Sequence, residues 1–183
     1  VLKRIYDELL VKAGVDFTFH TQLVDVNLNK GHVSEVVCSG KTGLFAIRAK
    51  VFIDCTGDGN LAFYAGASYD KGDVNGDMMP GTLCSLWSGI NWRKAYDSGL
   101  GFGASQIEKA IKDGVFTLED RHLPGIWPIG NSAGGGNVGH TFEIDGTDEE
   151  SLTKAYLWGR KSLIEYEKYY KEYLKGFENM ELV

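Results

Sequence analysis

The chain has 183 residues, and its 19 basic and 25 acidic side chains give a formal net charge of −6. Its 43% hydrophobic and 24% charged residues are close to globular averages, which excludes a disordered tail or a fibre. A net acidic chain without a basic stripe makes a poor nucleic-acid platform, because phosphate binding needs clustered Lys and Arg. No apolar run approaches the roughly 20 residues of a membrane-spanning helix. We therefore expect neither nucleic acid nor a membrane as a partner.

Glycine and cysteine usage narrow the class of protein further. The 24 glycines accompany only three prolines, which indicates tight turns or backbone close to a ligand rather than a flexible linker. The cysteines, Cys38, Cys55 and Cys84, are odd in number and lack C-x-x-C spacing, so we expect no disulfide framework and no zinc knuckle. The histidines also lack metal-ligand spacing. Free thiols favour the cytoplasm, although the compartment is unknown.

The first part of the sequence predicts a helix followed by a β-meander. Apolar residues recur with helical spacing from Leu2 to Ala13, and Gly14 stands where a helix would end. No initiator Met or capping residue precedes Val1, so we expect the chain to be cut from a longer protein. Alternating apolar residues predict strands at 15–19, 24–28, 33–38 and 45–49, in an antiparallel arrangement.

A short apolar run at 51–55 predicts a strand buried on both faces, followed by the glycine turn 56–59 and a short helix that Gly66 ends. Backbone N–H groups in such a turn can face a phosphate or the edge of a cofactor. An ordinary strand-to-helix turn explains the pattern equally well. The same stretch matches G-x-G-x-x-A, the dinucleotide fingerprint, but we reject that reading. The helix stops too early and no strand follows before residue 82.

The second part predicts a further sheet and a long helix. Strands are expected at 83–89, 126–129 and 138–144, with a helix at 105–112 and a glycine loop at 134–136. Thr147 and Glu150 form a capping box, with Thr147 at the N-cap. The aromatic and apolar residues behind it keep helical spacing, and Gly176 would close a helix of about 28 residues. The helical spacing of the tyrosines indicates that they pack against the core or another domain rather than form an aromatic binding stripe.

The motifs together resemble the FAD-dependent oxidoreductases of the glutathione-reductase-like superfamily. That family typically reads D-A-T-G-D-G-D-L-A, then G-A, then P-x-T-L. The matching segments here are 54–62, 66–67 and 80–83, followed by 138–140 and 145–148. Cys55 replaces the usual Ala, and Asn60 replaces the usual Asp. The resemblance covers essentially the whole chain.

The resemblance implies an α+β architecture that is part of an α/β FAD-binding fold. Residues 1–81 would form a partial FAD-binding domain with the meander and one parallel-type strand. Residues 82–146 would form an antiparallel substrate-domain section, and 147–183 a long capped helix returning toward the FAD domain. The family's G-x-G-x-x-G strand and its closing segment would lie outside this chain. Its partner would then be the rest of the parent protein, and FAD binding by this section alone would be weak or absent.

The resemblance also implies cofactor-binding residues. Thr56, Gly57 and Asp58 would line the FAD-facing edge of the turn, and Val24 would lie by the adenosine. A carboxylate suits ribose or ribityl hydroxyls and repels phosphate, so Asp58 fits those hydroxyls better than the pyrophosphate. Cys55, beside this turn, has no basic neighbour in the sequence that would lower its pKa, which favours an inert thiol.

For substrate chemistry the candidates are Arg121 and His140, with His122 and Asn137 beside them. A flavin enzyme needs a cation or donor near its substrate and a proton carrier near the transferred hydride. The structural alternatives are a solvated loop pair for Arg121 and His122, and a hydrogen-bonded structural histidine for His140.

The functional hypothesis is the central section of an FAD-dependent oxidoreductase that transfers hydride between flavin and an unknown small-molecule substrate. The section alone is expected to be inactive. The alternative hypothesis is a non-catalytic binding or assembly module on a flavoprotein-like scaffold.

Overall fold

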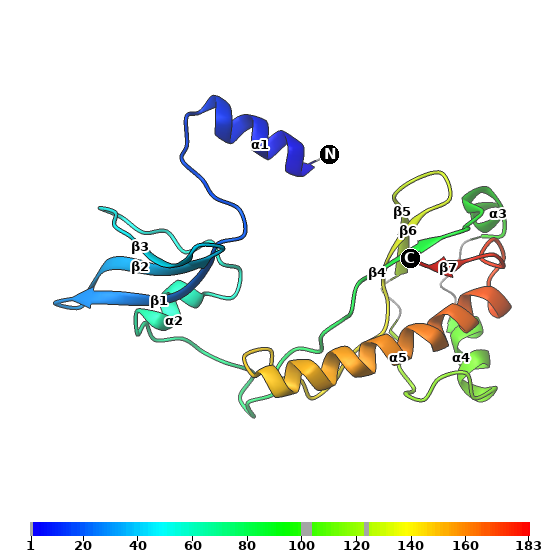
Figure 1. Ribbon diagram of the computed structural model, residues 1–183. Helices are drawn as coiled ribbons and strands as arrows, with labels where there is room; N and C mark the ends of the chain where they lie inside the picture. The colour runs from blue at the N-terminus through cyan, green and yellow to red at the C-terminus, as the bar shows by residue number, and fades with distance from the viewer. Residues whose placement is uncertain (1, 100–103, 123–124) are drawn as a thin grey trace. The chain divides into compact units, whose positions relative to one another are not determined.

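The computed structural model describes residues 2–99, 104–122 and 125–183, and the chain forms two compact units, Val1–Asp70 and Lys71–Val183. Each unit has its own antiparallel sheet, and the second also carries a long C-terminal helix (Figure 1). The structure is therefore mixed α+β, which confirms the predicted class.

The first unit contains a three-stranded meander. Its elements are α1 (Leu2–Lys12), β1 (Gln22–Asn29), β2 (His32–Gly40), β3 (Gly43–Ile47) and α2 (Asn60–Tyr64). The strands pair antiparallel in the order β1-β2-β3, which confirms the predicted meander. Lys30 and Gly31 join β1 to β2 with φ of 51° and 79°, and two positive φ values are what a two-residue hairpin of type I′ requires.

Two strands expected in this unit are not formed. Residues 15–19 and 51–55 have no strand pairing, and among the described residues neither segment has a neighbouring strand. The prediction of a strand buried on both faces at 51–55 is wrong in this structure, where Val51 and Ile53 are 74% and 80% exposed. Cys55 is exposed as well, contrary to the expectation of a buried thiol. A strand needs hydrogen-bonding partners along its edges, and an apolar sequence cannot supply them by itself.

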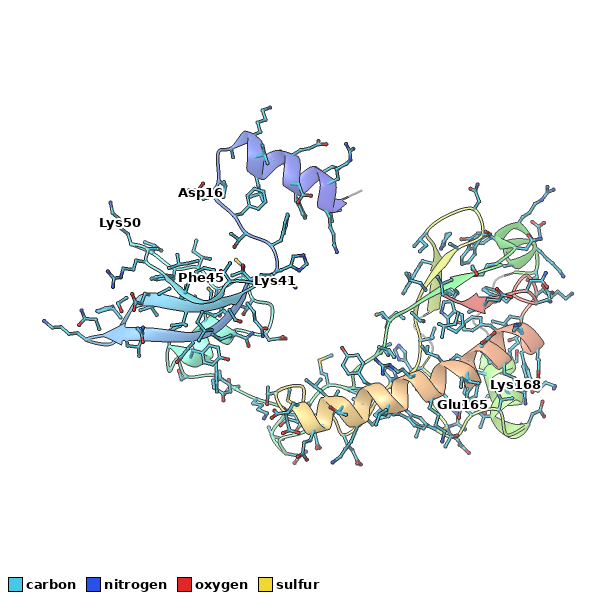
Figure 2. The ribbon with its side chains drawn as sticks, in the orientation of Figure 1. Asp16, Lys41, Phe45, Lys50, Glu165 and Lys168 are labelled. Carbon is cyan, nitrogen blue, oxygen red and sulfur yellow. The ribbon has the colours of Figure 1, made fainter. Side chains whose placement is uncertain are left out.

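The core of the first unit is small. Its buried apolar residues are Val26, Cys38 and Leu61, whereas all five residues of β3 are exposed. Phe45, labelled in Figure 2, lies on this strand. Other large apolar side chains that are exposed in this unit include Leu9, Val11, Phe19, Leu44, Ile47 and Phe63. This unit therefore leaves much apolar area uncovered by the described residues, and such surfaces mark interaction sites.

The second unit combines a four-stranded sheet with three helices. Its elements are β4 (Ser85–Ser88), α3 (Trp92–Asp97), α4 (Ala104–Lys112), β5 (Gly125–Pro128), β6 (Gly134–Asn137), α5 (Glu149–Tyr173) and β7 (Glu181–Leu182). The strands pair antiparallel in the order β5-β6-β4-β7. The predicted strands near 83–89 and 126–129 and the predicted helix at 105–112 are confirmed.

The glycine run at 134–136, predicted as a loop, is instead the inner strand β6. A Cβ atom on Gly136 would lie 2.7 Å from the indole nitrogen of Trp87, and one on Gly134 would lie 2.8 Å from the side chain of Ile90. Glycine is required because large core side chains cross the face of the strand. The strand predicted at 138–144 is reduced to an isolated bridge between Thr141 and Gly81.

Helix α5 is 25 residues long, slightly shorter than predicted. Its N-cap is Asp148 rather than Thr147, because the Asp148 carboxylate accepts a hydrogen bond from the backbone N–H of Ser151 at 2.7 Å. One face of the helix joins the core with Trp87, which is 1% exposed. The core residues on α5 are Leu163, Tyr166, Tyr169 and Tyr170. The prediction that the tyrosines pack, rather than form a binding stripe, is confirmed for these three.

A substitution at Gly89 tests how closely the chain after β4 approaches the chain before β7. Gly89 has φ of 71°, and an added Cβ would lie 1.9 Å from the carbonyl oxygen of Asn179, whereas Gly114 has φ of 72° and open space. Gly114→Ala should cost about 1 kcal/mol of unfolding free energy from backbone strain alone. Gly89→Ala adds a backbone clash and should cost about 3 kcal/mol or more. Urea unfolding measures both, and equal losses would contradict the close approach.

An ion pair near the start of the second unit makes its stability depend on pH. The Lys71 ammonium donates to Asp145 Oδ2 at 2.6 Å and to the Thr147 hydroxyl at 2.7 Å. Thr147 donates its hydroxyl to Asp145 Oδ1 at 2.6 Å and its backbone N–H at 2.9 Å. Lys71 first, and then Thr147, lower the pKa of Asp145 from 3.8 to about 2. The ionised carboxylate is therefore favoured by folding.

Because the folded-state pKa of Asp145 is depressed, its stabilising contribution is complete above pH 3.8 and is lost as the pH falls toward about 2. We expect Asp145→Asn to flatten the fall of unfolding free energy over that interval, and Lys71→Met to flatten it in part. Chemical denaturation at several acidic pH values measures the slope. A slope in Asp145→Asn as steep as that of the wild type would rule out this linkage.

Candidate functional site

The glycine turn before α2 is shaped by the carboxylate of Asp54. Its Oδ1 accepts the backbone N–H of Thr56 at 2.9 Å and the Thr56 hydroxyl at 2.7 Å, and its Oδ2 accepts the N–H of Ala62 at 3.0 Å. Thr56 Oγ1 accepts the N–H of Asn60 at 2.8 Å. The bonds from Thr56 and then Ala62 lower the pKa of Asp54, which keeps it ionised. Both carboxylate oxygens of Asp54 are therefore used to attach the turn to the first residues of α2.

The outer surface of this turn is open. Gly57 and Gly59 have φ of 86° and 72°, and a Cβ atom added at either would meet nothing within 4 Å. Asp58 is exposed between them, and no hydrogen-bond partner for its carboxylate lies among the described residues. Positive φ favours glycine, and glycine has no side chain to cover this edge, so a ligand can approach the backbone. The exposed edge therefore consists of glycine backbone and the Asp58 carboxylate.

Val24, the fourth residue predicted to bind the cofactor, lies in the same unit at an irregularity of β1. The register with β2 jumps between Leu23 and Asp25, so Val24 has no partner in the ladder. Such a bulge re-aims the backbone and is frequent next to binding sites. Helix α2 packs against β1, so the structure brings the strand that bears Val24 and the helix that follows the turn together.

His140, in the second unit, pairs with a carboxylate that the sequence analysis did not select. Its Nδ1 lies 2.7 Å from Oδ2 of Asp120, a residue that is 8% exposed. The other oxygen of Asp120 accepts the backbone N–H of His122 at 2.9 Å. The ring of His122 packs edge-on against that of His140, with centroids 5.1 Å apart. Two of the sequence candidates, His122 and His140, are therefore brought together by Asp120.

Arg121 points elsewhere. Its Nε lies 2.6 Å from Glu108 Oε1 and an Nη 3.4 Å from Glu119 Oε2, on the surface. These two carboxylates, Glu108 first, raise the pKa of the guanidinium. Among the described residues the structure shows no contact between Arg121 and His140, and the catalytic assignment of Arg121 stays a prediction. Asn137 is the last residue of β6, paired with Gly125.

A cavity of about 510 Å³ lies between α5 and the segment that follows His140. Its lining includes the aromatic residues Phe142 and Trp158 and the charged residues Glu143 and Lys154, together with Thr117, Thr141 and Ser151. Trp158 also lines the small space around Asp120 and His140, together with Leu118. The cavity and the space around the His140 imidazole therefore share two wall residues, Leu118 and Trp158.

Metal-ligand clusters and membrane-spanning helices are both absent from residues 2–99, 104–122 and 125–183. Those residues contain no group of three or more His, Cys, Asp or Glu side chains that could hold a metal ion. They also contain no helix long and apolar enough to cross a membrane.

The comparison with known families agrees with this reading of the sequence. A family model described as FAD dependent oxidoreductase matches residues 1–183. The chain belongs to this family of FAD-dependent oxidoreductases, since the match extends over its whole length. No curated protein and no solved structure matches the chain.

Two residues at these sites were not selected from the sequence. Asp54 is in the quoted motif, and its position two residues before Thr56 is typical of an Asx turn, a signal that could have shown its role. Asp120 is 20 residues from His140, and no local pattern connects the two. Only the path of the chain brings that carboxylate to the ring.

Amide hydrogen exchange can distinguish Asp54, which accepts hydrogen bonds from amides of the turn, from Asp58, which does not. Asp54→Asn leaves one acceptor oxygen where two are needed, so amide exchange at Thr56 and Ala62 should quicken roughly threefold to tenfold. Asp58→Asn, the matched control, should leave both rates unchanged, because its carboxylate holds neither amide. Hydrogen exchange followed by NMR measures the rates. Quickening in the control as large as in Asp54→Asn would contradict this division of roles.

Proposed function

We propose that the chain is the central section of an FAD-dependent oxidoreductase, in which flavin and a small-molecule substrate exchange a hydride. The observation that carries the proposal is the open glycine turn, which Asp54 and Thr56 hold on α2. Membership of the whole chain in the FAD-dependent family supports it. The cofactor supplies the hydride chemistry when bound, and the protein supplies binding, orientation and proton transfer.

In this proposal the first unit contributes one part of the FAD site. The backbone at Gly57 leaves room for the cofactor, because glycine has no side chain to cover the open edge. Thr56, Gly57 and Asp58 line the edge that faces FAD. The Asp58 carboxylate accepts hydrogen bonds from ribose or ribityl hydroxyls, whereas it would repel the pyrophosphate. Val24 lies by the adenosine, where the bulge frees it from the strand ladder.

The second unit contributes the substrate-binding section. His140 exchanges a proton with the substrate, a role for which an imidazole suits neutral pH. Arg121 is kept as a candidate for substrate binding, although its ion pairs would first have to open. The partner of the section is the rest of its parent protein. The exposed apolar residues of the first unit support this, because such area is normally covered.

The proposal is tested by titrating FAD into the full-length protein and into the 183-residue chain, followed by absorbance at about 450 nm. We expect bound flavin in the full-length protein and weak or no binding in the shorter chain. Gly57→Val in the full-length protein should weaken binding about tenfold or more, because the branched side chain fills the open edge. Gly76→Val is the matched control, since Gly76 has the same φ of 86° and equally open surroundings.

Equal weakening by both valine variants would contradict the placement of FAD at the turn. A well-folded full-length protein that binds no flavin would overturn the oxidoreductase proposal itself. It would favour the alternative, a non-catalytic binding or assembly module on a flavoprotein-like scaffold.

A further inference from the structure

We propose that Asp120 is a positioning residue that fixes the tautomer of His140, so that Nε2 is the proton acceptor beside the cavity of Phe142 and Trp158. The inference rests on the proposed function for its role in hydride transfer, but the geometry of the pair stands without it. Asp120 approaches Nδ1 at 2.7 Å from a buried position.

The hydrogen bonds of Asp120 determine where the proton of His140 lies. An ionised carboxylate only accepts hydrogen bonds. One oxygen accepts from the backbone of His122, and the other faces Nδ1 of His140. The network therefore assigns the proton of the neutral ring to Nδ1. Nε2 keeps its lone pair, and no hydrogen-bond partner for it lies among the described residues.

The His140 backbone is held as firmly as its ring. The indole N–H of Trp158 donates to the carbonyl oxygen of His140 at 3.1 Å. Gly139 has φ of 77°, and a Cβ there would lie 2.5 Å from the ring of Tyr166, so the chain passes directly against a core side chain. These contacts fix the backbone that carries the ring, and the hydrogen bond to Asp120 holds the ring itself.

The other ionisable groups next to the pair are Glu165, Tyr166 and His122. Glu165 of α5, labelled in Figure 2, accepts the backbone N–H of Thr117 at 3.0 Å and the Thr117 hydroxyl at 2.5 Å. Burial first, and then the charges of Asp120 and Glu165, raise the pKa of Tyr166, which keeps its hydroxyl neutral. His122 stands edge-on to the ring. Asp120 is thus the carboxylate that contacts the imidazole.

The cavity indicates the class of substrate that His140 would serve. Phe142 packs against the imidazole with ring centroids 5.5 Å apart, and Trp158 lines both the cavity and the space around the pair. The two aromatic residues suit the apolar body of a small alcohol or amine, and Glu143 and Lys154 in the same lining offer charged partners for its polar groups.

The proton step balances with the hydride step. An alcohol or amine that gives up a C–H hydride to the flavin must also release the proton of the adjacent O–H or N–H. The electron pair of that bond then forms the C=O or C=N of the product. Nε2 accepts the proton, and the imidazolium that results is stabilised by the Asp120 carboxylate. In the reverse direction the same nitrogen returns the proton.

The test reads the tautomer directly. In ¹⁵N-labelled protein, long-range ¹H–¹⁵N correlation spectra distinguish the two neutral forms, and His140→Gln identifies the signals. We expect Nδ1–H in the wild type. Asp120→Asn removes the charge and can donate its amide N–H to Nδ1, so the Nε2–H form should rise about tenfold or more relative to Nδ1–H.

Asp113→Asn is the matched control, because Asp113 pairs with Lys109 and Tyr173 and not with a histidine. It should leave the His140 signals unchanged. Asp120→Glu keeps the carboxylate and should retain Nδ1–H. Diethyl pyrocarbonate, which acylates an imidazole nitrogen that bears no proton, is the second probe. Modification of His140, counted by mass spectrometry, should slow about tenfold in Asp120→Asn.

An Nε2–H tautomer in the wild type would overturn the inference without any variant, so it is tested even if Asp120→Asn fails to fold. An unchanged tautomer in folded Asp120→Asn would overturn it as well. Neither readout uses flavin. A protein that binds no FAD but shows the expected tautomers would overturn the oxidoreductase proposal alone. Flavin binding together with an unchanged tautomer in Asp120→Asn would overturn only the role of Asp120.

Discussion

Close packing of α5 against the four-stranded sheet is the interaction on which the second unit depends. Trp87 and Ile126 from the sheet share one core with Tyr166 and Tyr170 from the helix. The core closes because β6 carries no side chain at Gly136, where the Trp87 indole and the Ser85 hydroxyl lie. Interiors are packed to crystal-like density, so a methyl group at such a position has nowhere to go.

The candidate chemistry of the second unit is a consequence of that core. Gly139 passes against the ring of Tyr166, and the next residue is His140. Trp158, on the same helix, holds the carbonyl group of His140 and forms a wall of the neighbouring cavity. The imidazole is therefore placed by helix packing, while Asp120 determines which of its nitrogens carries the proton. The position of the His140 imidazole and the site of its proton are therefore determined by different parts of the structure.

The first unit is organised differently. Few of its apolar residues are buried, and the glycine turn is held mainly by charge-assisted hydrogen bonds to Asp54. These bonds are local and leave the backbone edge at Gly57 and Gly59 open. A turn built this way keeps its shape without a large core beneath it. This local order allows a short motif to encode the shape of the turn.

The sequence by itself determined the features that depend on neighbouring residues. The hairpin at Lys30 and Gly31, the meander, the long helix and the D-x-T-G-D-G turn all follow from spacing, turn residues or a motif. The N-cap in the structure lies one residue after the predicted one. Thr147 and Asp148 are both residue types that cap helices, and only the hydrogen bond from Ser151 to Asp148 decides between them.

Only the tertiary structure decided the features that depend on distant partners. The apolar run at 51–55 lacks strand neighbours among the described residues, whereas glycines 134–136 become an inner strand because Trp87 and Ile90 fill the space that side chains would occupy. Asp120 contacts His140, which lies 20 residues later in the sequence, whereas Arg121, the neighbour of Asp120, forms an ion pair with Glu108. Strand pairing, packing and ion pairs act through space, and sequence patterns report only what is near along the chain.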